Sequence, residues 1–293
     1  MYRPYAPLLL LSALPGASPA LAADVQPASE PSIVVIGERK ENTPEKLDHI
    51  MPEVDGTKIT VTKKTSITRL DLLPTIVADN QRALFSRTPG LFVSEQQTPT
   101  QFNMSYRGLG NPQESEFVLV LQDGIPISTD WIGFPTLYYT PLPQSLEEVQ
   151  LIRGGSSLLY GPEPAPAVNF VSTRPAANQP FGGYSENVVG SDGLFSTYNT
   201  IEGSSGALSF RGNLAHLKSN GQRDNGASRL THGDLYLAYR PTTNSLWYLD
   251  FHRHYASSGD PGKLSFAQFV ANPDQSPTPF NHDWVTRTSF TVS

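Results

Sequence analysis

Cysteine is absent from the 293 residues of this chain. Disulfide frameworks, thiolate zinc centres, iron–sulfur clusters and cysteine nucleophiles are therefore excluded. Charged residues make up only 16% of the chain and hydrophobic residues 38%, both low for a compact helical domain. The formal net charge of −6 gives no support for a nucleic-acid partner, because phosphate binding requires clustered lysine and arginine.

Long apolar runs are also missing, since none reaches the roughly 20 residues that a membrane-spanning helix needs. The nearest approach is Pro7–Leu14, which follows Arg3 and precedes the small residues Ala20–Ala22. This order of a basic residue, an apolar stretch and a small-residue site is typical of a signal peptide. We expect residues 1–22 to be removed near Ala22/Ala23 and the protein to be exported. An N-terminal anchor helix is the alternative, and the proline and glycine that soon follow disfavour it.

Glycine and proline are plentiful, at 23 and 26 residues, and aromatic residues reach 10%. This composition favours short strands joined by turns. The predicted mature chain opens with a flexible tail over residues 23–45, within which Ser32-Ile33-Val34-Val35-Ile36 is β-prone. Such a patch can pair as an added strand with the sheet edge of another protein. An ordinary first strand is the alternative.

Residues 46–178 carry the pattern of a small mixed α/β domain. A helix is predicted over Ile76–Thr88, which Pro89-Gly90 would end. The continuous apolar run Phe117–Leu121 predicts a buried strand. Leu146–Ile152 and Val168–Val171 are the second and third predicted strands. The sequence Gln122-Asp123-Gly124 predicts a tight turn after the first of these strands.

Residues 181–293 change to strict alternation. Leu208, Phe210 and Leu214 alternate with polar or small residues, and the later segments repeat the pattern. Segments of about ten residues with a period of two, joined by alternating short and long connections, are typical of transmembrane barrel strands. A soluble β-sandwich shows the same alternation. The region has room for about six strands and cannot close a barrel alone, because bacterial barrels start at about eight strands.

No catalytic motif is complete. Gly108-Leu109-Gly110 lacks the third glycine of a dinucleotide fingerprint, and Gly154-Gly155-Ser156-Ser157 lacks the glycine that would complete a nucleophile elbow. We therefore predict no enzymatic activity. His252 and His254 would share one face of a strand with Asp250 and could bind a metal ion. The polar lining of a barrel is the favoured interpretation, so no metal site is predicted.

Five segments, in order and in spacing, resemble the plug domain of TonB-dependent outer-membrane receptors. They are Arg107-Gly108-Leu109, Val120–Pro126, Val149–Gly155, Tyr160-Gly161-Pro162 and Val168–Val171. The sequence Gly259–Ser265, leading to Ala267-Gln268-Phe269, is similar to a loop of the ferric dicitrate-type receptors. The resemblance implies a plug followed by the first antiparallel strands of a 22-stranded barrel. It also implies active transport of a ferric chelate across the outer membrane, with no cofactor beyond the iron of the cargo.

The resemblance also implies roles for particular residues. Ser32–Ile36 matches the TonB box, which binds a periplasmic energy transducer of the TonB type. Arg107 and Arg153 match plug arginines that act as latches by pairing with barrel glutamates. The matched turn positions are Gly108, Gly124, Gly154, Gly155 and Gly161. Cargo contacts are expected in the apical loops, with these candidates: Gln101, Asn103, Gln113, Glu114, Trp131, Phe134, Tyr138 and Tyr139.

These loops are acidic and aromatic where an anionic ferric citrate complex would favour arginine. A less anionic or more aromatic chelate suits them better. The main alternative to a transporter is a plug-only periplasmic binding domain, which would not contact outer-membrane lipid.

Overall fold

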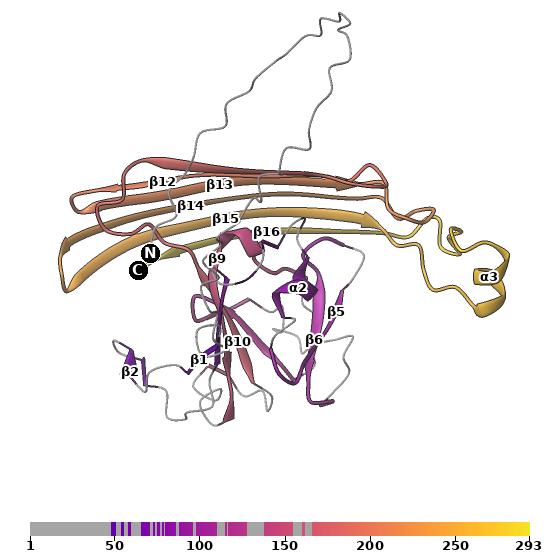
Figure 1. Cartoon of the computed structure of the whole chain (residues 1–293), viewed down its shortest axis with the longest axis horizontal. Coiled ribbons are helices and arrows are strands. Elements are labelled where there is room, and N and C mark those ends of the chain that lie inside the picture. The colour runs from indigo at the N-terminus through magenta and orange to yellow at the C-terminus, as the bar shows by residue number, and fades with distance from the viewer. Residues whose placement is uncertain are drawn as a thin grey trace, which may run out of the picture. The chain divides into compact units, whose positions relative to one another are not determined.

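The computed structural model describes two sheets that follow one another along the chain (Figure 1). The described residues are 48–50, 54–55, 58–59, 66–70, 73, 75–76, 78, 80–85, 88–95, 98–109, 115, 117–127, 138–154, 160–161 and 166–293. The predicted signal peptide, the tail and the TonB-box segment lie outside them.

The first sheet is mixed and has six strands in the order β1-β4-β9-β10-β7-β8. The strands are β1 Asp48–Ile50, β4 Ser66–Arg69, β7 Leu119–Gln122, β8 Ile125–Pro126, β9 Leu146–Ile152 and β10 Ala167–Ser172. The pair β7 and β10 is parallel and the other pairs are antiparallel. Two hairpins accompany this sheet, β2 Val54–Asp55 with β3 Lys58–Ile59, and β5 Leu91–Glu95 with β6 Phe102–Tyr106. All three predicted strands of this region are confirmed, although β7 begins two residues later than predicted.

The helix predicted over Ile76–Thr88 is wrong in its extent. Among the described residues of that range only α2, Gln81–Leu84, is helical. The Asn80 side chain caps its first turn by accepting a hydrogen bond from the Ala83 N–H at 3.1 Å. Ala78 has a φ of 51°, which an α-helix does not permit. The apolar spacing thus marked a buried segment of the chain correctly but overestimated the length of the helix.

The core of this domain is built from side chains of the mixed sheet, of β6 and of the α2 segment. Phe85 packs against Phe102 and Phe170, with ring centroids 5.6 and 6.0 Å apart. Met104, Val120, Val149 and Val168 belong to the same buried cluster. Aromatic pairs at these separations contribute beyond their buried area.

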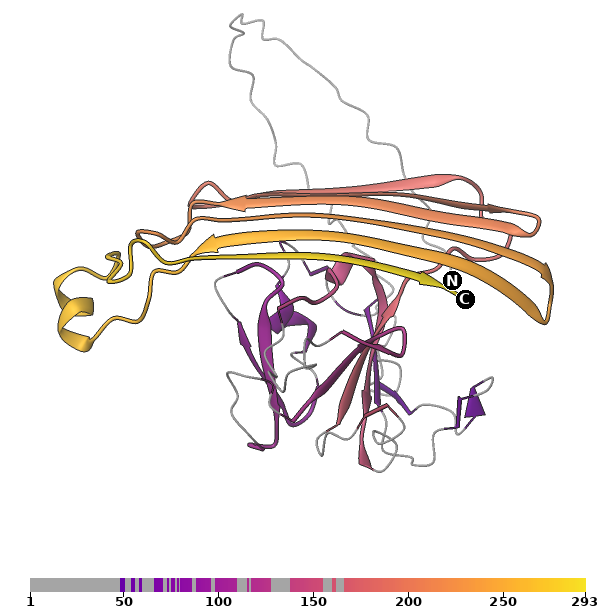
Figure 2. The same ribbon diagram turned by 180° about the vertical axis from the view of Figure 1, so that it is seen from behind.

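The second sheet, called the long sheet below, is antiparallel throughout, and its six strands follow chain order. They are β11 Gly182–Val189, β12 Phe195–Ser205, β13 Leu208–Ser219, β14 Ser228–Thr242, β15 Ser245–Gly259 and β16 His282–Val292. Within the described residues the sheet does not close, because β11 and β16 are its two edges. Figure 2 shows these strands running side by side, with α3, Phe266–Ala271, in the long connection between β15 and β16.

The long sheet has one polar and one apolar face, as the alternation predicts. The apolar face carries exposed side chains such as Leu208, Leu214 and Trp247, which are 62%, 68% and 64% exposed. The polar face is buried and carries Arg211, Asn213, His232, Tyr236, Asp250, His252 and His254. Neither helix of the described residues is long and apolar enough to cross a membrane.

We predict that Phe102→Ala lowers the free energy of unfolding by about 3–5 kcal/mol, because a fully buried phenylalanine leaves a cavity. Urea unfolding followed by fluorescence measures this. Phe92→Ala is the matched control, since Phe92 lies on the neighbouring strand β5 and is 58% exposed. Equal losses in the two variants would contradict the assigned core.

Candidate functional site

The connection between β7 and β8 is a tight turn that orients the Asp123 carboxylate. Asp123 and Gly124 both have positive φ, 51° and 81°, which aspartate tolerates and glycine adopts freely. The Asp123 N–H donates to the Phe170 carbonyl and the Gly124 N–H to Asn169 Oδ1, each at 2.8 Å. These bonds fix the predicted turn against β10.

The Asp123 carboxylate is held by three donors. Its Oδ1 accepts from the Ser172 N–H at 2.9 Å, and its Oδ2 accepts from the Ser172 hydroxyl at 2.7 Å. The same Oδ2 accepts from Arg174 Nη2 at 2.9 Å. Since Ser172 ends β10, the end of this strand and the β7–β8 turn together position a charged group at the border of the domain.

Arg174 joins this carboxylate to the long sheet. Its Nη2 also donates to Asp250 Oδ2 on β15, at 2.6 Å, and its guanidinium lies 4.1 Å from the ring centroid of Tyr236 on β14. Burial lowers the pKa of Arg174, but the carboxylates of Asp123 and Asp250 more than offset this and hold it above its ordinary value. The guanidinium therefore stays charged and bridges two carboxylates, one from each sheet.

Further polar contacts connect the same two parts of the chain. Thr98 Oγ1 lies 2.8 Å from Ser258 Oγ, and Thr100 Oγ1 lies 3.0 Å from His254 Nε2. Arg287 Nη1 on β16 donates to the Ile127 carbonyl at 3.0 Å. The contact thus includes hydrogen bonds and charges, and beside them an apolar cluster in which Leu142 packs with Leu217 and Leu230 of the long sheet.

Tyr139 lies within this contact. The Arg287 guanidinium carbon is 4.9 Å from the centroid of its ring. Burial, reinforced by nearby Asp234, raises the pKa of the Tyr139 hydroxyl well above its ordinary value. The hydroxyl therefore stays neutral, and its ring is available as a face for the guanidinium.

The predicted latch and turn residues occupy different places. The guanidinium of Arg107 lies 5.1 Å from the ring centroid of its neighbour Tyr106, and Arg153 is half-buried just after β9. Their pairing with barrel glutamates stays a prediction. Gly108 and Gly154 have positive φ, 76° and 72°, as expected of turn glycines. Gly161 is half-buried, and Gly155 lies outside the described residues.

The predicted cargo contacts are divided by burial. Gln101 and Tyr138 are half-buried, whereas Asn103 and Tyr139 are only 1% and 4% exposed. Asn103 Oδ1 accepts from the Ser115 hydroxyl at 3.2 Å. The remaining four candidates, Gln113, Glu114, Trp131 and Phe134, lie outside the described residues. All eight roles as cargo contacts stay predictions.

Sequence reasoning missed the Arg174 bridge. Asp123 lies inside the Val120–Pro126 motif, and Arg174 closely follows the Val168–Val171 motif. Two of the three charged residues of the bridge therefore lie in or next to a recognised motif. The third, Asp250, is 76 residues from Arg174, and no local pattern connects them. Sequence reasoning also considered His252 and His254 as metal ligands without their neighbours on β14. The structure places His252 with His232 and Asp234 in a group that could hold a metal ion.

A domain that contacts the polar face of an unclosed antiparallel sheet, whose other face is apolar, defines the plug-and-barrel class of membrane protein. Residues 57–168 match the family model of the TonB-dependent Receptor Plug Domain. Residues 57–168 therefore form a TonB-dependent receptor plug domain, and the antiparallel strands of an unclosed sheet follow it, which confirms the predicted plug domain and fold class.

Solved structures of this class are similar to the chain. The unliganded ferric citrate transporter FecA is 24% identical over 78% of this chain and 36% of its own, with a TM-score of 0.66. The pyoverdine-bound FpvA of P. aeruginosa is 17% identical over 78% of this chain and 30% of its own, with a TM-score of 0.57. The siderophore receptor PirA of Acinetobacter baumannii is 18% identical over 78% of this chain and 37% of its own, with a TM-score of 0.53. The chain thus spans about a third of the length of each.

We predict that Arg174→Gln lowers the free energy of unfolding by about 3 kcal/mol, because it removes the guanidinium that is paired with the buried Asp250 carboxylate. Urea unfolding in detergent measures the loss. Arg174→Gln combined with Asp250→Asn should recover most of it, since the unpaired charge is then removed. Arg240→Gln is the matched control, because Arg240 is exposed near the end of β14. A loss no larger than that of the control would argue against the bridge.

Proposed function

We propose that the protein is an outer-membrane transporter that imports a ferric chelate with energy supplied by a TonB-type partner. The observation that carries the proposal is the plug domain, residues 57–168, in contact with the polar face of the long sheet through Arg174. A plug on the inner face of a barrel blocks free diffusion. Transport then requires an external pull on the plug.

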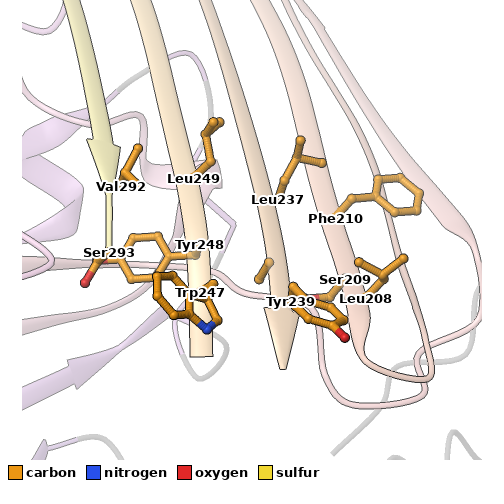
Figure 3. Close-up of a pocket in the computed structure, with 11 residues that line it drawn as sticks. Leu208, Ser209, Phe210, Leu237, Tyr239, Trp247, Tyr248, Leu249, Val292 and Ser293 are labelled. Atoms are coloured by element: carbon orange, nitrogen blue, oxygen red, sulfur yellow. The ribbon is translucent and has the colours of Figure 1, made fainter. Parts of the chain in front are cut away.

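The apolar face of the long sheet supports a place in the outer membrane. Figure 3 shows apolar side chains from β13, β14, β15 and β16 side by side at the end of the sheet that carries the short turns. Tyr239 and Trp247 lie at this end, and Tyr255 and Trp284 lie toward the other. Tyr255 is eight residues beyond Trp247 on β15, about 27 Å along an extended strand. Aromatic girdles on either side of an apolar band of about 25 Å are typical of transmembrane barrels.

The chemistry of the plug contact suits a plug that must be held and then moved. Each hydrogen bond between neutral groups contributes only about 0.5–1.5 kcal/mol net, because water replaces the lost partner. Pairs such as Thr98 with Ser258 therefore open at modest cost once water enters. The Arg174 bridge costs more to break, and we propose it as the main resistance to plug movement.

We propose Ser32-Ile33-Val34-Val35-Ile36 as the segment on which the energy transducer pulls. The family resemblance and its β-prone composition support this role, since an added strand transmits force through several main-chain hydrogen bonds at once.

For the cargo we propose a ferric chelate that is less anionic or more aromatic than ferric citrate. FecA is a ferric citrate transporter, FpvA binds pyoverdines and PirA is a siderophore receptor. The long connection between β15 and β16 carries Phe266, Phe269 and Phe280, which are 84%, 57% and 95% exposed. Exposed aromatic rings at the outer mouth would fit an aromatic chelate by stacking.

The alternative of a plug-only periplasmic domain is disfavoured by the long sheet. A water-soluble protein rarely exposes a contiguous apolar patch of the kind that Leu214, Leu237 and Trp247 make. Contact with lipid would remove the free-energy cost of exposing this apolar patch to water.

We predict that cells carrying Val34→Pro/Val35→Pro keep chelate binding at the surface but lose at least tenfold in uptake of the ⁵⁵Fe-labelled chelate. Proline removes two backbone donors and so prevents strand pairing. Surface binding at 4 °C and uptake at 37 °C separate the two steps.

Val34→Thr/Val35→Thr is the matched control, because threonine keeps the β-propensity and both N–H groups. It should retain most of the uptake. Uptake by the proline variant equal to that of the control would refute energy coupling through this segment. Failure of the unmodified protein to bind any ferric chelate would refute the cargo class instead.

A further inference from the structure

The polar face of the long sheet gathers histidine and aspartate from two neighbouring strands. In the register of β14 with β15, His232 lies opposite His254, Asp234 opposite His252 and Tyr236 opposite Asp250. Because side chains alternate with a period of two, these residues all point to the same face. His232 and His254 are each 1% exposed and His252 is 9% exposed.

Two imidazole nitrogens converge on one carboxylate oxygen. His232 Nε2 lies 2.7 Å from Asp234 Oδ1, and His252 Nδ1 lies 2.6 Å from the same atom. The ligand atoms of these three residues all lie within 4.8 Å of one another. Two histidines and a carboxylate, each offering one atom to a common point, form a donor set that zinc and similar transition metals take.

The hydrogen bonds of the cluster leave one of these nitrogens unsatisfied. His252 Nδ1 is hydrogen-bonded to Asp234 Oδ1, and Asn213 Nδ2 donates to Asp234 Oδ2 at 2.8 Å. His232 Nε2, although close to Asp234 Oδ1, is not aligned for a hydrogen bond and has no hydrogen-bond partner. A buried polar atom without a partner is costly. A proton shared between His252 and Asp234 does not relieve it, whereas a cation placed between the three ligand atoms does.

The opposite side of each imidazole is held, as metal-binding histidines usually are. His252 Nε2 lies 3.2 Å from Asp250 Oδ1, and Asp250 is itself paired with Arg174. His232 Nδ1 lies 3.4 Å from His254 Nδ1, and His254 Nε2 contacts Thr100 of the plug. The His252 ring is therefore oriented by a contact that continues to Arg174, and the His232 ring by one that continues to Thr100 of the plug.

Space and charge also favour a cation. A cavity of about 20 Å³ adjoins Asp234 and His252, which is room for about one water molecule as a further ligand. The carboxylates of Asp123, Asp234 and Asp250 outnumber the nearby guanidinium groups of Arg174 and Arg287, while Arg211 is paired with Glu202. These carboxylates and guanidinium groups together leave excess negative charge around the site. Ligand atoms around a tetrahedral zinc are about 3.3 Å apart, so binding requires the two rings to move outward by roughly half an ångström.

We propose that His232, Asp234 and His252 form a binding site for a divalent transition metal, zinc in the first instance, in the barrel wall beside the plug. The site is separate from cargo iron, because all three ligands are on the wall, with both histidines buried and Asp234 half-buried. A bound ion crosslinks β14 to β15. The ion also fixes the wall groups that the plug contacts. His252 leads to Asp250, which is paired with Arg174, and His232 leads to His254, which contacts Thr100.

The test uses the full chain without a histidine tag, purified in detergent, stripped with EDTA and titrated with Co²⁺ and then Zn²⁺. We expect one equivalent of Co²⁺ to bind with the intense visible absorption of a low-symmetry site, and Zn²⁺ to displace it. His232→Gln and His252→Gln should each weaken Zn²⁺ binding at least tenfold. Zn²⁺ should raise the unfolding midpoint of the unmodified chain and not that of either variant.

His216→Gln is the matched control, because His216 lies on the apolar face of β13 and contacts Thr231 there. It should bind Zn²⁺ like the unmodified chain. Where a histidine variant does not fold, Asp234→Asn replaces it, since asparagine has the same shape and can still accept from Asn213. No saturable Zn²⁺ binding, or binding unchanged in His232→Gln and Asp234→Asn, would overturn the proposal and leave a hydrogen-bonded network in the barrel lining.

Discussion

The bridge from Asp123 through Arg174 to Asp250 is the interaction on which the arrangement of the two sheets depends. It joins a turn of the mixed sheet to the wall of the long sheet through one guanidinium group. Two carboxylates around one half-buried cation are stable only while all three groups stay together, because a buried charge such as that of Asp250 is costly when it loses its partner. The bridge therefore fixes position more than it adds net stability.

This constraint explains the composition of the surrounding contact. The plug meets the wall through hydroxyl, imidazole and guanidinium groups and through one apolar cluster around Leu142, whereas its own core is aromatic and aliphatic. An apolar core keeps the plug folded, and the hydrogen-bonded part of the contact can exchange its partners for water. The same polar face concentrates His232, Asp234 and His252, so that a metal site and a plug contact share one stretch of β14 and β15.

Much of the fold could be predicted because its signals are local. A continuous apolar run marked β7, segments rich in apolar residues marked β9 and β10, and Gln122-Asp123-Gly124 marked the turn that orients Asp123. The helix over Ile76–Thr88 was overestimated because apolar spacing records burial as well as helix. A residue at positive φ, Ala78, cannot be recognised from spacing. The candidate site was predicted only in part, since Asp250, His252 and His254 were singled out and their partners were not.

The sequence by itself determined which residues of the long sheet share the apolar face and which share the polar face, because a strand alternates with a period of two whatever its neighbours are. It also determined the plug motifs and their order. Only the tertiary structure decided that Arg174 meets Asp250 and that Asp234 lies between His232 and His252. These side-chain contacts depend on strand register and on how the plug contacts the wall. Both are set by packing between segments far apart in the chain, which no local pattern encodes.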